Sequence, residues 1–81
     1  MKTSVEISYY PLNEEYIPPI KNFIERLNMN PDLIVRTSTM STQVFGEYRN
    51  VMQALTNEIE KSFGLPHSVF VLKIINADLE K

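Results

Sequence analysis

Hydrophobic and polar side chains alternate at the start of the chain. In residues 3–10, TSVEISYY, the positions Val5, Ile7 and Tyr9 are separated by polar ones. Successive side chains of a strand point to opposite faces of a sheet, so this alternation predicts a half-buried strand with a polar outer face. The strand is expected to end at Pro11, because proline cannot donate a hydrogen bond to a sheet ladder.

Two later segments have apolar residues at spacings of three and four, the period of an amphipathic helix. The first helix is expected to begin near Ile17 or Pro18, since proline is tolerated in a first helical turn. The second is expected to begin near Tyr48 and to close at Gly64 and Pro66. The apolar stripe of the first helix consists of Ile17, Ile20, Ile24 and Leu27, with Phe23 beside it. The stripe of the second consists of Val51, Leu55, Ile59 and Phe63, with Met52 adjoining it.

The remaining segments are rich in β-branched residues, which favour strands. A second strand is expected in DLIVRTS, residues 32–38, and a third in STQVFGEY, residues 41–48. These two strands form a hairpin that turns around Met40. A last strand is expected in HSVFVLKIINA, residues 67–77. One face of this strand should carry Phe70, Leu72 and Ile74, and the other Val69, Val71, Lys73 and Ile75.

The element order is therefore β-α-β-β-α-β, within a single domain spanning residues 1–81. Right-handed crossovers place both helices on one face of a four-stranded antiparallel sheet, which is the ferredoxin-like arrangement of an α+β protein. The first strand is central in this topology. The other sheet face would be left uncovered, with a mixture of side chains too apolar for water. We therefore expect self-association through open sheet faces or edges.

Composition narrows the range of functions. Eight basic and ten acidic residues give a net charge of −2, so no broad basic surface for nucleic acid is expected. The chain has no cysteine, which removes disulfides, thiolate metal sites and cysteine nucleophiles. No apolar run approaches the roughly 18 residues of a membrane span, and nothing resembles a signal peptide. The sequence predicts a cytoplasmic protein without a membrane segment.

The sequence contains no recognisable catalytic pattern. An acylphosphatase-like enzyme would need a glycine-rich phosphate loop after the first strand, where this chain has SYYPLNEEY. An RNA-recognition module would interleave aromatic and basic residues on its inner strands, and a metallochaperone would need a cysteine pair. The single histidine, His67, has no second metal-ligand type at a suitable spacing and is expected in a loop. We therefore expect no enzyme activity, no metal and no cofactor.

Hydroxyl side chains gather where the first three strands lie side by side. They are Ser8, Thr37, Thr39, Ser41 and Thr42. Two interpretations stay open at this point. Threonine favours strands and pairs across them without any ligand, or these hydroxyls line a binding site. Gly46 favours the second interpretation, because a glycine inside a strand marks a bulge or a close approach of another group.

Two segments resemble the signatures of the thiamine/hydroxymethylpyrimidine-binding proteins, a family of small ferredoxin-like domains. EISYYPL is similar to a strand that ends S-x-Y-P, and RTSTMSTQVFGEYRNVMQAL is similar to T-x-x-x-S-T-x-x-x-G followed by a helix. The resemblance extends from Val5 to about Ile75. It implies non-catalytic binding of thiamine or its hydroxymethylpyrimidine moiety, in thiamine uptake, salvage or regulation, by dimers or tetramers. The ligand-binding residues it implies are Ser8, Thr37, Ser41, Thr42 and Gly46.

The chemistry of an aminopyrimidine adds further candidates. Hydroxyls donate or accept hydrogen bonds, so serine and threonine can satisfy the ring nitrogens and the exocyclic amine. Tyr10 or Tyr48 could stack on the ring, and Glu6 or Glu47 could pair with the amine or with the positive charge of a thiazolium. The alternative function is a regulatory or scaffolding homo-oligomer that binds a different small molecule or no ligand. The pocket could lie within one protomer or between two.

Overall fold

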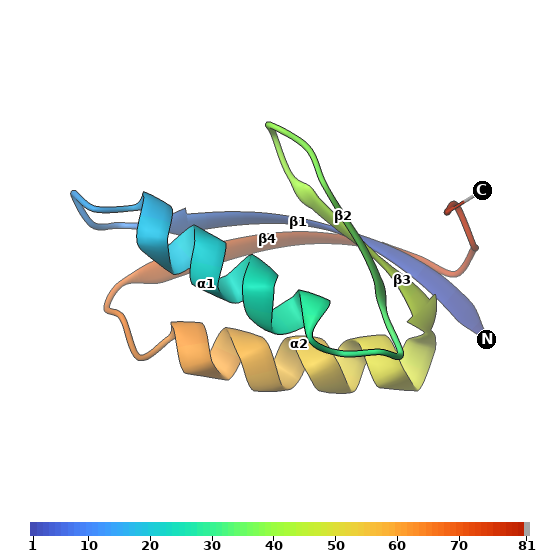
Figure 1. The fold of residues 1–81 in the computed structure, drawn as a ribbon. Coiled ribbons are helices and arrows are strands. Elements are labelled where there is room, and N and C mark those ends of the chain that lie inside the picture. Colours follow the sequence, from blue (N-terminus) through green and yellow to red (C-terminus); the bar gives the residue numbers. More distant parts are fainter. Residues whose placement is uncertain (81) are drawn as a thin grey trace.

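The computed structural model describes residues 1–80. Its elements are β1 (Lys2–Pro11), α1 (Ile17–Asn28), β2 (Ile34–Thr37), β3 (Thr42–Glu47), α2 (Tyr48–Ser62) and β4 (Ser68–Ile75). The strands form one antiparallel sheet in the order β2-β3-β1-β4, and both helices cover the same face of it (Figure 1). The predicted ferredoxin-like α+β arrangement with a central first strand is confirmed. Neither helix within residues 1–80 has the length and apolar character needed to cross a membrane.

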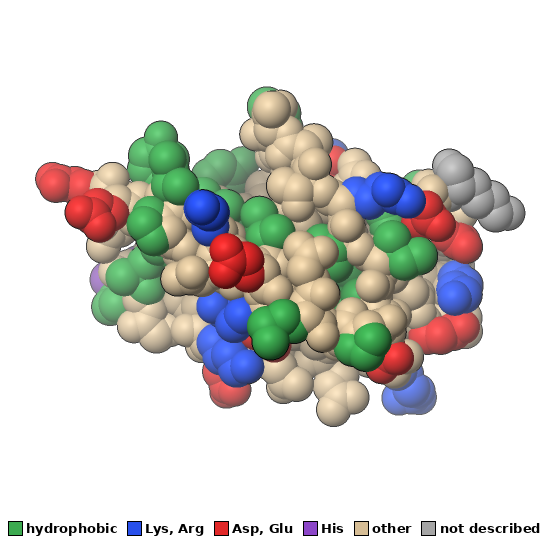
Figure 2. Space-filling model, in the orientation of Figure 1, with side chains coloured by type: hydrophobic (Ala, Val, Ile, Leu, Met, Phe, Trp, Pro, Cys, Tyr) green, Lys and Arg blue, Asp and Glu red, His purple; other side chains and the backbone are tan. Residues whose placement is uncertain are grey.

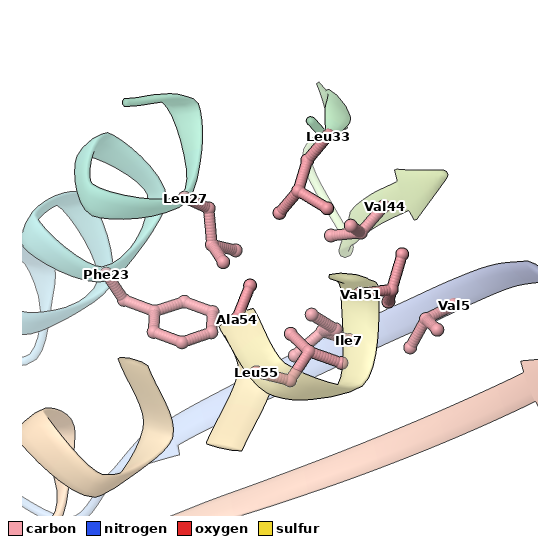
Figure 3. Close-up of a cluster of buried hydrophobic side chains, with 9 residues drawn as sticks. All are labelled: Val5, Ile7, Phe23, Leu27, Leu33, Val44, Val51, Ala54 and Leu55. Atoms are coloured by element: carbon pink, nitrogen blue, oxygen red, sulfur yellow. The ribbon is translucent and has the colours of Figure 1, made fainter. Parts of the chain in front are cut away.

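The core lies between the helices and the sheet, and side chains from both layers converge in it (Figure 3). The alternation in β1 places Val5 and Ile7 inward, each 2% exposed, as the sequence predicts. Four stripe residues lie outside the core. Ile20 and Ile24 of α1 are only partly buried, and Ile17 in the first turn of α1 and Phe63 just after α2 are both more than half exposed. The buried apolar members of the cluster are Val5, Ile7, Phe23, Leu27, Leu33, Val44, Val51, Ala54 and Leu55.

A polar contact joins the two helices beside this core. Arg26 of α1 donates hydrogen bonds to the Glu58 carboxylate of α2 at 2.7 Å and to the Ser62 hydroxyl at 2.8 Å. Both charged side chains are partly buried, with exposed fractions of 28% and 17%, so solvent screens the pair only in part. This contact joins the C-terminal half of α1 to the C-terminal end of α2.

The sheet face opposite the helices is only partly open, whereas the sequence predicts an uncovered face. Residues 76–80 fold back over one end of it. The Ser4 hydroxyl donates to the Ala77 carbonyl at 2.7 Å and accepts from the Leu79 N–H at 2.9 Å. Glu80 forms an ion pair with Arg36 of β2 at 2.6 Å. Residues 76–80, referred to below as the tail, lie over Ser4, which is consequently buried despite pointing away from the helices.

The other end of the same sheet face remains uncovered. Tyr10 of β1 lies opposite Val69 of β4, and Ser8 lies opposite Val71. Tyr10, Val69 and Val71 are 55%, 43% and 51% exposed. These four residues are referred to below as the outer patch. Exposed apolar side chains gathered in this way are typical of a surface that contacts another molecule.

Candidate functional site

A cleft of about 480 Å³ opens between the tip of the β2–β3 hairpin, the end of β1 and the start of α1. Figure 1 shows the hairpin tip turned away from the end of β1, and Figure 2 shows the surface hollowed between the hairpin and α1. Small-molecule sites have volumes of about 300–1,000 Å³. The cleft is therefore large enough for a heterocyclic ligand.

One wall of the cleft is the hairpin, whose tip is organised by Ser38. The Ser38 N–H donates to the Ser41 carbonyl at 2.9 Å. The Ser38 hydroxyl in turn accepts from the backbone N–H groups of Met40 and Ser41, both at 3.3 Å. Serine makes such turns by using its hydroxyl in place of a backbone acceptor. The hairpin turns around Met40 as predicted, without the Asn-Gly dipeptide that marks many hairpins.

The predicted hydroxyl residues come together around the cleft: Thr37, Ser41 and Thr42 on the hairpin, and Ser8 on β1. Thr37 and Thr42 are paired across β2 and β3, so their side chains share the sheet face toward the helices. Ser8 and Ser41 belong to the opposite face. Both pairs reach the cleft because it lies at the end of the sheet, beyond the last β1–β3 pair, Ile7 with Thr42.

Within residues 1–80, the cleft hydroxyls fall into two groups. Those of Tyr9, Ser38 and Ser41 have protein partners. Six further hydroxyls line the cleft without a protein partner in this part of the chain; they belong to Ser8, Tyr10, Tyr16, Thr37, Thr39 and Thr42. A hydroxyl can donate or accept, so these groups can adapt to a ligand of either kind.

Glu6 does not line the cleft, but it accepts a hydrogen bond from the Ser41 hydroxyl, which does. The Ser41 hydroxyl donates to Glu6 Oε2 at 3.1 Å, and Lys73 lies 3.6 Å from Glu6 Oε1. A carboxylate only accepts hydrogen bonds, so the Ser41 hydrogen points to Glu6 and its lone pairs remain for other groups. Ser41 therefore offers an acceptor to a molecule in the cleft.

The opposite wall is apolar and aromatic. The Tyr9 ring is fixed, because it stacks on Phe70 with centroids 4.1 Å apart and meets the edge of Phe23 at 5.7 Å. Tyr10, in contrast, is largely exposed and lines the cleft. Of the two tyrosines at the end of β1, Tyr10 is thus the ring that remains available for stacking on a ligand.

Three sequence candidates lie elsewhere. Gly46 packs under α2: a Cβ there would lie 3.1 Å from the Asp32 carbonyl oxygen and 3.3 Å from Val51 Cγ2. The close approach expected of this glycine is therefore made by the protein's own atoms. Glu47 and Tyr48 border a different hollow, next to the N-terminus. There the hydrogen bond from the Met1 ammonium group at 2.9 Å, together with its charge, lowers the pKa of Glu47.

A second cavity, of about 420 Å³, lies on the outer sheet face beside the tail. Its walls include Ser4, Glu6, Phe45, Lys73 and Leu79. Ser4 is hydrogen-bonded to the tail. Glu6 accepts a hydrogen bond from Ser41 and forms an ion pair with Lys73. Because these polar groups already pair with each other, the cavity offers fewer open positions to a polar ligand than the cleft does.

The sequence interpretation missed several lining residues. Tyr16, Ser38 and Met40 border the cleft but are not among the residues that the sequence predicts for a site. The signal for Ser38 is its position at the start of a hairpin turn, where serine is favoured. In the part of the chain that the structure describes, no three histidine or acidic side chains gather as metal ligands.

No protein-family model matches the chain, and no curated protein matches it in sequence. Solved structures do resemble it. A Streptococcus pneumoniae protein has a TM-score of 0.89 at 20% identity, with 100% of this chain and 92% of that one covered. A hypothetical protein from Methanocaldococcus jannascii has a TM-score of 0.82 at 24% identity, covering 99% and 84%.

A third similar structure has a name that refers to function. It is a Thermotoga maritima protein provisionally assigned to thiamine biosynthesis or salvage. Its TM-score is 0.85 at 20% identity, and the match covers 95% of this chain and 85% of that one. At such identities the likeness establishes the fold.

Proposed function

We propose that this protein binds thiamine, or the hydroxymethylpyrimidine moiety of thiamine, in the cleft and does not transform it. The observation that carries the proposal is the gathering of Ser8, Tyr10, Thr37, Ser41 and Thr42 around one cleft. These residues come from two segments separated in the sequence, and both segments resemble the signatures of thiamine-binding domains. The similar Thermotoga fold, provisionally assigned to thiamine biosynthesis or salvage, supports the same ligand class.

The proposed roles follow from the chemistry of each wall. Ser41, whose hydrogen is donated to Glu6, accepts from a ligand donor such as the exocyclic amine. Thr37, Thr42 and Ser8 adjust to the ring nitrogens or to the hydroxymethyl group. Tyr10 supplies the aromatic face. Glu6 contributes through Ser41 and through its negative charge, and does not contact the pyrimidine.

Calorimetric titration tests the proposal. Thiamine and hydroxymethylpyrimidine should both release or absorb heat on binding, whereas the isolated thiazole moiety should not. Absence of binding by both pyrimidines at millimolar concentration would overturn the proposal. Consumption of a bound pyrimidine with formation of a product would instead identify an enzyme.

Thr42→Val tests the hydroxyl wall. Valine keeps the branched shape in a strand and removes the hydroxyl, so we expect about tenfold weaker pyrimidine binding with little change in stability. Thr56→Val is a matched control, because Thr56 is exposed on α2 and bonds its own helix at the Met52 carbonyl. Unchanged affinity in Thr42→Val would show that its hydroxyl has a structural role only.

We also propose that the protein self-associates through the outer patch, as a homodimer or homotetramer. The patch presents Tyr10, Val69 and Val71 to solvent on the part of the sheet that the tail does not cover. Burying this surface against a second copy would stabilise a domain of 81 residues. Val71→Lys should lower the mass measured by light scattering, and the same mass in both proteins would exclude this interface.

A further inference from the structure

Within residues 1–80, one edge of β1 has no strand partner at the cleft. β1 pairs with β4 along its whole second half, as far as Pro11 with Ser68. Its pairing with β3 ends earlier, at Ile7 with Thr42. Beyond that point the hairpin turns away from β1 (Figure 1). The β1 residues after Ile7 therefore have a strand on one side and the cleft on the other.

The hydrogen-bond pattern shows which backbone groups point to this edge. Both backbone groups of a strand residue point to the same side, and the side alternates along the strand. The Leu12 N–H donates to the His67 carbonyl, on the β4 side, at 2.8 Å. The Met1 carbonyl accepts from the Tyr48 N–H, on the β3 side, also at 2.8 Å.

Even-numbered residues of β1 therefore bond β4, and odd-numbered residues point toward β3. Ile7 uses its two groups in the pair with Thr42. The next odd-numbered residue, whose backbone groups also point toward the β3 side, is Tyr9, which lines the cleft. In the pairing of residues 1–80 the N–H and C=O of Tyr9 have no partner on the β3 side. Pro11, the last odd-numbered residue of β1, has no N–H and offers only a carbonyl.

We propose that the Tyr9 backbone binds the aminopyrimidine edge of the ligand. The ligand then occupies the position that a neighbouring strand would take beside β1. The Tyr9 N–H donates to a ring nitrogen, and the Tyr9 carbonyl accepts from the neighbouring exocyclic amine. The inference rests on the proposed pyrimidine binding and adds to it a named pair of atoms. It assigns the specific hydrogen bonds to the main chain, while the surrounding hydroxyls satisfy the rest of the ring.

The chemistry of the two partners is complementary. An aminopyrimidine has an acceptor and a donor on adjacent atoms, and an extended residue presents a donor and an acceptor side by side on one edge. Peptides that add to an exposed strand edge use the same backbone groups. The Tyr9 ring is held against Phe70 and Phe23, so the backbone beside it is in a fixed position before a ligand arrives. Such preorganisation favours affinity.

Side-chain substitution cannot remove these backbone groups without affecting the strand, so the test is amide hydrogen exchange followed by NMR. In the protein without ligand, the Tyr9 amide should exchange faster than the amides of Ser8 and Tyr10, which bond β4. Saturating hydroxymethylpyrimidine should slow Tyr9 exchange at least tenfold and leave Ser8 and Tyr10 unchanged. A pyrimidine that lacks the amine should bind about tenfold more weakly, because the Tyr9 carbonyl then loses its donor.

The possible results separate the inference from the proposed function. Pyrimidine binding in the calorimeter without slower exchange at Tyr9 would overturn the inference and leave the proposed function standing. A Tyr9 amide that is already protected without ligand would also overturn the inference, because the edge would then be occupied. No binding of hydroxymethylpyrimidine or thiamine would overturn both.

Discussion

Substitution of Gly46 by alanine separates a packing role from a ligand-binding role. The added methyl group would lie 3.1 Å from the Asp32 carbonyl oxygen and 3.3 Å from Val51 Cγ2. Val51 is fully buried, and Asp32 contributes a backbone atom, so neither neighbour moves without disturbing the contact between α2 and the sheet. The substitution therefore adds volume at a site that is already close-packed.

Two opposing effects set the expected magnitude. Overpacking of a core costs about 1–3 kcal/mol, and replacement of glycine by alanine recovers about 0.4–1 kcal/mol by restricting the unfolded chain. The net loss should be about 1–2 kcal/mol, which for a domain of this size lowers Tm by roughly 5–15 °C. Urea unfolding with an unchanged m-value would give this loss directly.

The matched control for Gly46→Ala is Gly64→Ala. A Cβ at Gly64 would approach the Lys61 carbonyl oxygen to 3.2 Å, but at an exposed helix end where the chain has room to adjust. Pyrimidine affinity, measured below the transition, should be the same in Gly46→Ala and in the unchanged protein. A stable Gly46→Ala protein that has lost pyrimidine binding would refute the reasoning and return Gly46 to the site.

Two further predictions concern charged groups. Arg26→Met leaves the largely buried Glu58 carboxylate without its 2.7 Å partner, and we expect a loss of about 1–3 kcal/mol in urea unfolding; an unchanged midpoint would show that the pair contributes nothing. For Glu47, the lowered folded-state pKa favours the ionised carboxylate, so its contribution is present at neutral pH and is lost as pH falls through that lowered value. The Tm of Glu47→Gln should therefore be lower than that of the unchanged protein at neutral pH, and the gap should close in acid. A gap that persists unchanged in acid would contradict the assignment.

Local patterns in the sequence predicted the fold well. The alternation in β1 and the helical stripe positions report which side chains are buried, and burial is what selects one sheet face or one helix face. The order of elements then leaves one strongly favoured topology. The predicted stripe of α1 was less accurate: the buried residues of this helix are Phe23 and Leu27, whereas Ile20 and Ile24 are only partly buried and Ile17 is exposed.

The tail and the site depended on contacts that no local pattern reports. Residues 76–80 have no periodicity, and their position follows from the Ser4 hydroxyl and from Arg36, both remote in sequence. The contact of Ser41 with Glu6 and the unpaired edge at Tyr9 depend on the strand register and on where the hairpin turns away. The glycine signal at Gly46 was real, but sequence alone could not distinguish a ligand from the protein's own backbone.

The central claim is that a pyrimidine binds in the cleft between the hairpin and α1. Two-dimensional NMR of the labelled protein, titrated with hydroxymethylpyrimidine, tests it most directly. The account predicts saturable shift changes centred on Ser8, Tyr10, Thr37, Ser41 and Thr42, with little change at the residues of the cavity beside the tail. Absence of any shift at millimolar ligand, or changes centred on Ser4, Phe45 and Leu79, would contradict it.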